Sequence, residues 1–222
     1  DSGEKKKNAL FLKLMLIFLV LSLTVKAEVV AEGGLGPLLR VAKNSGDTGL
    51  SGLIYYSLSK LSLLEQNRQA IGVHLPLLVD LLRGDNPEWK GHAIKTLANL
   101  ISVPVLREQI YKIAFRPVMR ALETAHPSLH VEASTILYSF IDGTEYAERA
   151  QSELAADVKV FGDWLATWLG LKERDDRLRN HVAALANILK LLVVCFRTRR
   201  QEGRGMLRTV CALTYIRKPE VQ

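Results

Sequence analysis

A pattern that recurs about every 40 residues constrains the fold of this chain more than any other feature. Gly34-Leu35-Gly36-Pro37-Leu38-Leu39 has a counterpart in His74-Leu75-Pro76-Leu77-Leu78-Val79, and each segment leads through a glycine-containing turn to further apolar stretches. Pro37, Pro76 and Pro117 are 39 and 41 residues apart. We expect each proline in the first turn of a helix, where its missing N–H costs little. Such periods indicate stacked helical units, because each unit alone leaves its apolar face uncovered.

The second of these units, residues 72–110, has the clearest helical pattern. Two groups of apolar residues recur at the three- and four-residue spacing of a buried helix stripe: Leu75, Leu78, Leu81 and Leu82, then Ala93, Leu97, Leu100 and Ile101. Arg83-Gly84-Asp85-Asn86-Pro87 lies between them and has the residues that end one helix and begin the next. Leu and Ala dominate the chain and strand formers do not alternate, so the sequence predicts an all-α fold.

This unit resembles the armadillo repeat family, through Leu75-Pro76-Leu77-Leu78 and the later Leu97-Ala98-Asn99-Leu100. The resemblance covers residues 72–110 well, 33–71 and 111–150 more loosely, and 155–196 in part. It implies a short armadillo-like α-solenoid over residues 33–196. Together with the N-terminal segment described below, the expected fold is all-α, an α-solenoid with one N-terminal transmembrane helix.

The resemblance also implies a set of protein-binding residues. The positions that match the family's peptide-binding asparagine are Lys60, Asn99, Ser139 and Asn187. Importin-like members also carry a tryptophan four residues earlier, where this chain has Lys95 and Ala183. Binding of a nuclear-localisation signal is therefore not expected, while Asn99, Asn187, Lys60 and Lys95 remain candidates for contacts on a concave face.

Other motifs carry weaker signals. Trp164 and Trp168 are four residues apart, which suits core packing or a partner surface. His126 and His130 have a metal-like spacing but lack a third ligand. Gly33-Gly34-Leu35-Gly36 follows no strand and reads as a flexible joint. Because no catalytic triad or paired-carboxylate arrangement can be assembled from the spacing, we expect neither an enzyme nor a metal or other cofactor.

The N-terminal region, residues 1–32, predicts a membrane anchor. Three lysines, Lys5–Lys7, precede the largely apolar stretch Asn8–Val25, whose 18 residues as a helix would be about 27 Å long, close to the hydrocarbon thickness of a bilayer. We expect residues 9–25 to contact lipid and Lys13 to extend toward the lysine-rich end. A signal peptide cleaved near Val25-Lys26-Ala27, or a buried core helix, would give a similar pattern.

The C-terminal tail, residues 197–222, carries most of the net charge of +7. It holds seven basic and two acidic residues, whereas the rest of the chain is nearly balanced. Five of the basic residues follow the last apolar helix directly: Arg197, Arg199, Arg200, Arg204 and Arg208. The tail could bind an acidic partner, anionic lipid or RNA, it could be a capping helix, or it could be a solvated extension with no role.

The expected function is that of a non-catalytic, membrane-anchored scaffold or accessory subunit that binds other protein subunits of a membrane complex. The start at Asp1, the basic balance and the apolar segment favour a single-pass protein of the mitochondrial inner membrane. One alternative is an armadillo-type nucleotide-exchange cochaperone of Hsp70 in the endoplasmic reticulum lumen. Another is an RNA- or ribosome-associated subunit that uses the Arg-rich tail, although nucleic acid is not the expected partner.

Overall fold

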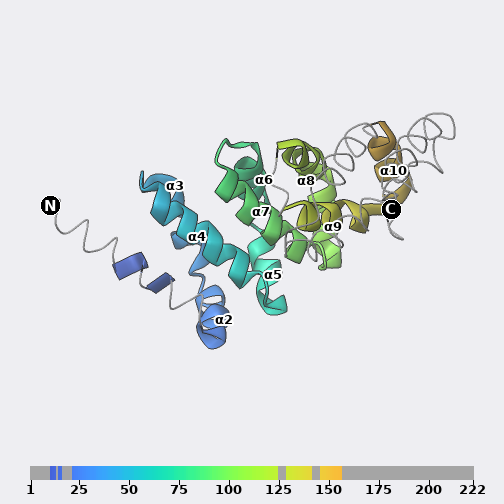
Figure 1. The fold of residues 1–222 in the computed structure, drawn as a ribbon. Helices are drawn as coiled ribbons and strands as arrows, with labels where there is room; N and C mark the ends of the chain where they lie inside the picture. The colour runs from blue at the N-terminus through green and yellow to red at the C-terminus, as the bar shows by residue number, and fades with distance from the viewer. Residues whose placement is uncertain (1–10, 14, 17–21, 125–128, 142–145, 157–222) are drawn as a thin grey trace, which may run out of the picture. The chain divides into compact units, whose positions relative to one another are not determined.

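The computed structural model describes residues 11–13, 15–16, 22–124, 129–141 and 146–156. These residues form helices joined by short turns, and the described part of the chain contains no strand (Figure 1). The predicted all-α class is confirmed.

The chain divides into two compact units, Asp1–Leu129 and His130–Gln222. The labelled helices of the first unit are α2 (Leu23–Ala31), α3 (Leu35–Asn44), α4 (Thr48–Leu61), α5 (Glu65–Gly72), α6 (Leu75–Arg83), α7 (Pro87–Leu100) and α8 (Pro104–Thr124). The second unit has α9 (His130–Ile141), which packs against α10 (Ala147–Ala156).

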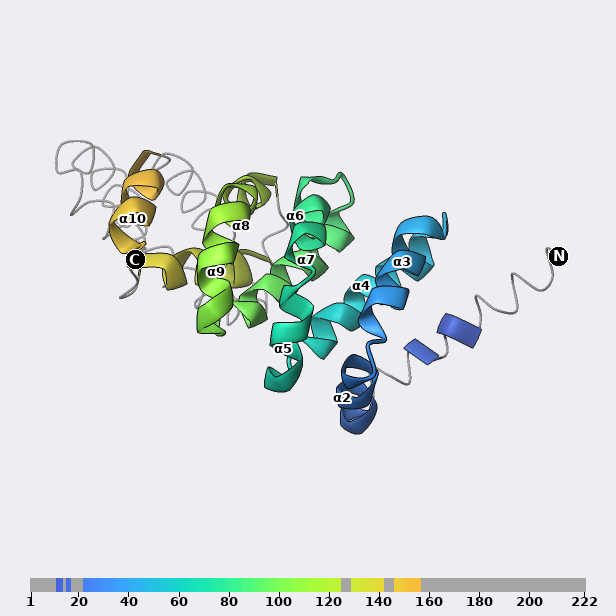
Figure 2. The same ribbon diagram turned by 180° about the vertical axis from the view of Figure 1, so that it is seen from behind.

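Two successive groups of three helices share one arrangement in the first unit. Helices α2, α3 and α4 have 9, 10 and 14 residues, and α5, α6 and α7 have 8, 9 and 14. In Figures 1 and 2, α4 and α7 lie side by side, with α3 and α6 to one side of them and α2 and α5 to the other. The recurrence seen in the sequence therefore corresponds to a three-helix pattern that occurs twice.

The helix boundaries follow from local capping. The Asn86 side chain accepts hydrogen bonds from the Glu88 and Trp89 N–H groups at 3.0 and 3.1 Å, and Pro87 occupies the first turn of α7. Pro76 lies in the first turn of α6. The predicted break between α6 and α7 is therefore confirmed, because Asn86 supplies acceptors that the free N–H groups of α7 need.

The core of the first unit includes the apolar stripes that the spacing predicted. Leu78 of α6 and Leu97 of α7 are 1% and 0% exposed, and α6 packs closely on α7. Their burial confirms the predicted helix register, since a register shifted by one or two residues would turn them toward solvent.

Pro117 departs from the prediction. Instead of beginning a helix, it lies inside α8, a single helix of 21 residues. A proline there removes one backbone hydrogen bond. Its neighbours Val118 and Met119 are 0% and 3% exposed, and α8 packs against α6. Burial of this stretch offsets the lost bond, so α8 runs without a break from Pro104 to Thr124.

The glycines between α2 and α3 form a tight turn and not the flexible joint expected from the sequence. Gly33 has φ +75°, a conformation that favours glycine. A Cβ at Gly34 would lie 2.8 Å from the Val29 carbonyl oxygen, so this turn requires a residue without a side chain. The turn therefore sets the path from α2 into α3.

Residues 9, 10, 14 and 17–21 of the predicted membrane-spanning segment, residues 9–25, lie outside the described residues. Its last part is described: Ser22 is extended, with φ −99° and ψ 126°, and its Oγ caps α2 by accepting from the Val25 N–H at 3.4 Å. Helix α2 then packs against α5, so residues 23–31 contact the helical unit. Within the described ranges, no helix combines the length and the apolar character that crossing a bilayer requires.

Asn67 joins α2 to the helices that follow it. This asparagine is 2% exposed, and its Nδ2 donates to the Lys26 and Leu61 carbonyl oxygens at 3.1 and 3.2 Å. The Asn67 amide thereby has two acceptors in a buried place, where an unpaired polar group would be costly. One side chain therefore connects α2, α5 and the end of α4.

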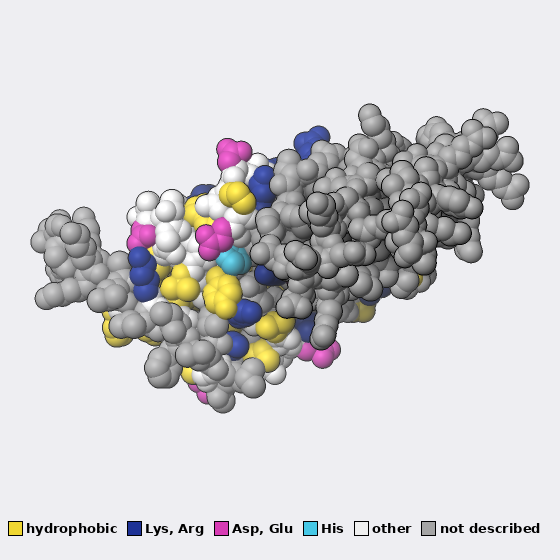
Figure 3. Space-filling model, viewed as in Figure 1, with side chains coloured by type: hydrophobic (Ala, Val, Ile, Leu, Met, Phe, Trp, Pro, Cys, Tyr) yellow, Lys and Arg dark blue, Asp and Glu magenta, His cyan; other side chains and the backbone are white. Residues whose placement is uncertain are grey.

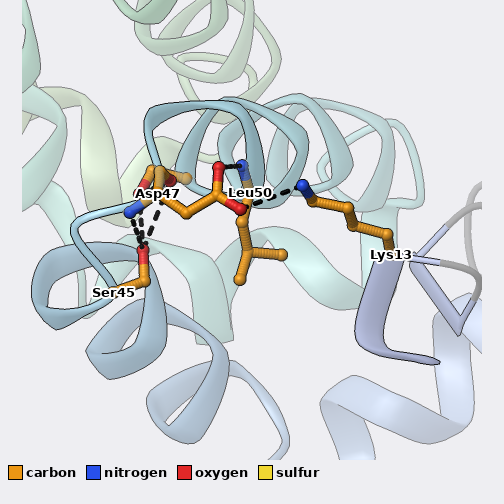
Figure 4. Close-up of polar contacts among 5 residues, drawn as sticks. Lys13, Ser45, Asp47 and Leu50 are labelled. Carbon is orange, nitrogen blue, oxygen red and sulfur yellow. Dashed lines mark hydrogen bonds and ion pairs between the residues drawn. The ribbon is translucent and has the colours of Figure 1, made fainter. Parts of the chain in front are cut away.

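Lys13 forms an ion pair with a residue 34 positions later (Figure 4). Its Nζ lies 2.9 Å from Asp47 Oδ2, while Asp47 Oδ1 accepts from the Leu50 N–H at 2.9 Å and caps α4. The Lys13 hydrogen bond, followed by that from Leu50, lowers the pKa of Asp47 below its usual value of 3.8. Lys13 was expected to extend toward Lys5–Lys7; in the structure it pairs with the α3–α4 turn, and nearby Leu16 is 1% exposed.

We expect Leu97→Ala to destabilise the full chain by about 2–5 kcal/mol, because it leaves a cavity in a fully buried position. Val73→Ala serves as the control, since Val73 is 76% exposed and its truncation should cost less than about 0.5 kcal/mol. Urea unfolding followed by circular dichroism measures both. Equal effects of the two substitutions would contradict the register described above.

We expect Asn67→Ala to cost about 1–3 kcal/mol, because it removes the two buried hydrogen bonds from the amide to the Lys26 and Leu61 carbonyls. In a chain that begins at Gly33, the Lys26 carbonyl is gone and the same substitution should cost less. The comparison of these two costs by urea unfolding is a double-mutant cycle for the α2 contact. The same cost in both chains would show that Asn67 does not hold α2.

Candidate protein-binding face on α4 and α7

Helices α4 and α7 run in the same direction. A Cβ at Gly52 would lie 3.3 Å from Trp89 Nε1, and further along the pair Ser62 contacts Asn99. Residue numbers rise together on both helices, so the axes are parallel. The absence of a side chain at the buried Gly52 lets the two helices approach closely at this point.

Two aromatic contacts join the helices. The rings of Tyr55 and Trp89 are edge-to-face with centroids 5.2 Å apart, and those of Tyr56 and His92 are edge-to-face at 5.5 Å. Tyr55 is 3% exposed and belongs to the core, whereas Tyr56 is 36% exposed. The first pair therefore stabilises the packing, and the second reaches the surface.

Five side chains make up what we term the α4–α7 face: Tyr56, Lys60, His92, Lys95 and Asn99. Lys60 Nζ lies 5.2 Å from the centroid of the Tyr56 ring, a cation–π distance, and Lys95 is exposed. Figure 3 shows hydrophobic, basic, acidic and histidine side chains close together over α4 and α7. The surface thus combines an aromatic ring with two positive charges.

His92 has an unusual polar environment within this face. Its Nε2 is buried and lies 3.6 Å from Glu88 Oε1, which is longer than a normal hydrogen bond. Burial of the imidazole lowers the pKa of His92 below its usual value of 6.5. The charge of Glu88 opposes this change, while Lys95 and Lys60 add to it. The imidazole is consequently neutral at pH 7.

Asn99 takes part in a contact between the two groups of helices. Its Nδ2 donates to Ser62 Oγ at 2.8 Å, and Ser62 Oγ in turn donates to the Ser59 carbonyl at 2.8 Å. Arg68 adds a second link, from its Nη1 to Ser102 Oγ at 2.8 Å. Asn99 therefore has a structural role in joining α7 to the α4–α5 turn, beside its predicted role in binding.

The structure brings together three of the predicted site residues, Lys60, Lys95 and Asn99, on one pair of helices. The matching residue Ser139 lies on α9 of the other unit, where its Oγ donates to the Ile136 carbonyl at 2.6 Å. The remaining predicted residues lie outside the described ranges: Asn187, Trp164, Trp168, Arg197, Arg199, Arg200, Arg204 and Arg208.

Sequence reasoning missed Tyr56 and His92. A signal for Tyr56 was present, because it precedes Lys60 by four residues, as Lys95 precedes Asn99. His92 had no comparable signal, since its environment depends on Tyr56 and Lys60 of another helix.

The face has the chemistry of a binding surface. Across the described ranges, no three His, Cys, Asp or Glu side chains come together as metal ligands could. A ring, two ammonium groups and an amide can hold a polypeptide by stacking, ion pairing and hydrogen bonding.

Comparison with known proteins gives no match for this chain, whether against protein-family models, curated proteins or solved structures. The interpretation of the face therefore depends on its own geometry and on the sequence resemblance.

We expect NMR titration to place the pKa of His92 below 6.5, and Glu88→Gln to lower it further by removing the opposing charge. Because the unfolded chain then binds a proton more readily than the folded one, folding stability should fall as the pH drops below about 6.5. His92→Gln should reduce this loss. A His92 pKa above 6.5 would contradict the described burial.

Proposed function

We propose that this chain is a non-catalytic, armadillo-like helical-repeat scaffold that binds an extended segment of a partner protein across the α4–α7 face. The observation that carries the proposal is the convergence of Tyr56, Lys60, Lys95 and Asn99 on two parallel neighbouring helices. The recurrence of the three-helix pattern supports the α-solenoid part of the proposal.

Parallel helices suit this role because side chains at equivalent positions of the two helices point in the same direction. A bound segment that crosses α4 and α7 would meet side chains at equivalent positions of the two helices. Tyr56 of α4 is equivalent to Lys95 of α7, and Lys60 of α4 to Asn99 of α7. These side chains are already held by neighbours: Lys60 by the Tyr56 ring and Asn99 by Ser62. Less conformational entropy is then lost on binding than with freely rotating side chains.

Membrane attachment through residues 9–25 is a second part of the proposal, with the mitochondrial inner membrane as its location. The apolar stretch and the preceding lysines support it. Lys13 and Leu16 instead make protein contacts in the described structure, so insertion would require Lys13 to leave Asp47. Lipid and the helical unit would thus compete for this segment.

The partner-binding proposal is tested by photo-crosslinking from single positions. A photoreactive residue in place of Tyr56 or Lys95 should give the same protein adducts in a native membrane extract. The same residue in place of Asp80, exposed on α6, should not give them. Identical adducts from all three positions, or none from the first two, would end the proposal for this face.

A charge-neutral control separates binding from folding. We expect Tyr56→Ala with Asn99→Ala to remove the adducts formed from position 95 without loss of helical content in circular dichroism, since Tyr56 is exposed and Asn99 is partly exposed. The loss of Asn99 also breaks its bond to Ser62, so Tyr56→Ala alone should be compared with it. If Tyr56→Ala leaves every adduct intact, the ring does not contact the partner.

Membrane attachment is tested by alkaline carbonate extraction. We expect the full chain to remain with the membranes and a chain that begins at Ser22 to be released, because the latter lacks most of the apolar stretch. The start at Ser22 retains the cap of α2 and its contact with α5, so the helical unit keeps its fold. Release of the full chain by carbonate would contradict the anchor.

A further inference from the structure

We propose that the segment bound by the α4–α7 face is acidic, with Asp or Glu carboxylates lying between Lys60 and Lys95. This inference rests on the proposed binding function and names the chemical class of the partner. It follows from the charges that the structure brings together on α4 and α7.

The first observation is the charge balance around His92. The charged groups that act on this imidazole are Glu88 and Lys95 of α7 and Lys60 of α4. The neutral imidazole of His92 is therefore surrounded by two positive charges and one negative charge. Glu88 lies at the start of α7, so the stretch of the face beyond His92, toward Lys95 and Asn99, is positive.

The second observation is that one of the lysines is held in place. Lys60 lies over the Tyr56 ring, and Tyr56 in turn contacts His92 edge-to-face. A positive charge held in one position favours an anionic partner more than a mobile charge does, since less side-chain entropy is lost when the ion pair forms. A basic segment would be repelled by the same two lysines.

Binding of an acidic segment should be linked to proton uptake at His92. A carboxylate beside Lys60 and Lys95 offsets their repulsion of a proton on the imidazole. Further burial by the segment acts in the opposite direction. That second effect is small, because 14% of the His92 side chain is exposed before binding. The proton is therefore held more tightly in the complex, and affinity should rise as the pH falls.

The test begins with selection from a library of random twelve-residue peptides displayed on phage, with the full chain as the target. Peptides rich in Asp and Glu should be enriched. In fluorescence-anisotropy titrations, Lys60→Gln with Lys95→Gln should weaken their binding by about tenfold, at roughly threefold for each lysine. The matched control is Lys43→Gln with Lys112→Gln, which removes the same charge from exposed positions on α3 and α8 and should have little effect.

The outcomes separate this inference from the function on which it rests. Enrichment of neutral or basic peptides whose binding requires Tyr56 would overturn the acidic class and keep the binding function. No enrichment over a target with Tyr56→Ala and Asn99→Ala would overturn both. If Lys43→Gln with Lys112→Gln weakened peptide binding as much as Lys60→Gln with Lys95→Gln, the effect would be one of net charge. That result would contradict binding of the carboxylates between Lys60 and Lys95.

Two further probes cover other anions. Phosphatidylserine vesicles and a single-stranded RNA are titrated against the same variants. If either binds through Lys60 and Lys95 more strongly than the selected peptides do, the partner is not an acidic protein segment and the inference fails.

The pH arm uses the selected peptides at pH 7.5 and 5.5, where Asp and Glu remain largely ionised. Wild-type affinity should increase about threefold or more at the lower pH. His92→Gln should keep the preference for acidic peptides and lose this increase. An increase of the same size in His92→Gln would place the titrating group elsewhere and contradict the position of the carboxylates near the imidazole.

Discussion

The close parallel packing of α4 against α7 is the constraint on which the candidate face depends. Glycine at residue 52 leaves room for Trp89, and this approach brings the Tyr56 ring to His92 and the Ser62 hydroxyl to Asn99. A Cβ at residue 52 would require the Trp89 indole to move by a few tenths of an ångström. The edge-to-face contact of Trp89 with the buried Tyr55 ring leaves little freedom for such a movement.

Much of the fold could be predicted from local patterns in the sequence. The burial of Leu78 and Leu97 and the cap at Asn86 were predictable because helix periodicity and capping act over four residues or fewer. Pro117 was not, because the same residue type can begin a helix or lie within one, and burial of Val118 and Met119 decides between them. The sequence alone holds no measure of that burial.

The candidate face was predictable only in part. Lys60, Lys95 and Asn99 came from the resemblance, and their role in binding stays a prediction. The contacts that give them a shared environment join residues about 36 positions apart, such as Tyr56 and His92. The same holds for Lys13 and Asp47, 34 positions apart. Pairings at this distance depend on how whole helices stack, which no short motif encodes.

Asn67 has a mechanical consequence. Its amide holds the Lys26 carbonyl of α2 and the carbonyl of Leu61, the residue that directly follows Lys60. A force applied at Ser22 would act on α2 first, and Asn67 would pass part of that force to the end of α4. Tension applied at the start of α2 would in this way reach the backbone beside Lys60.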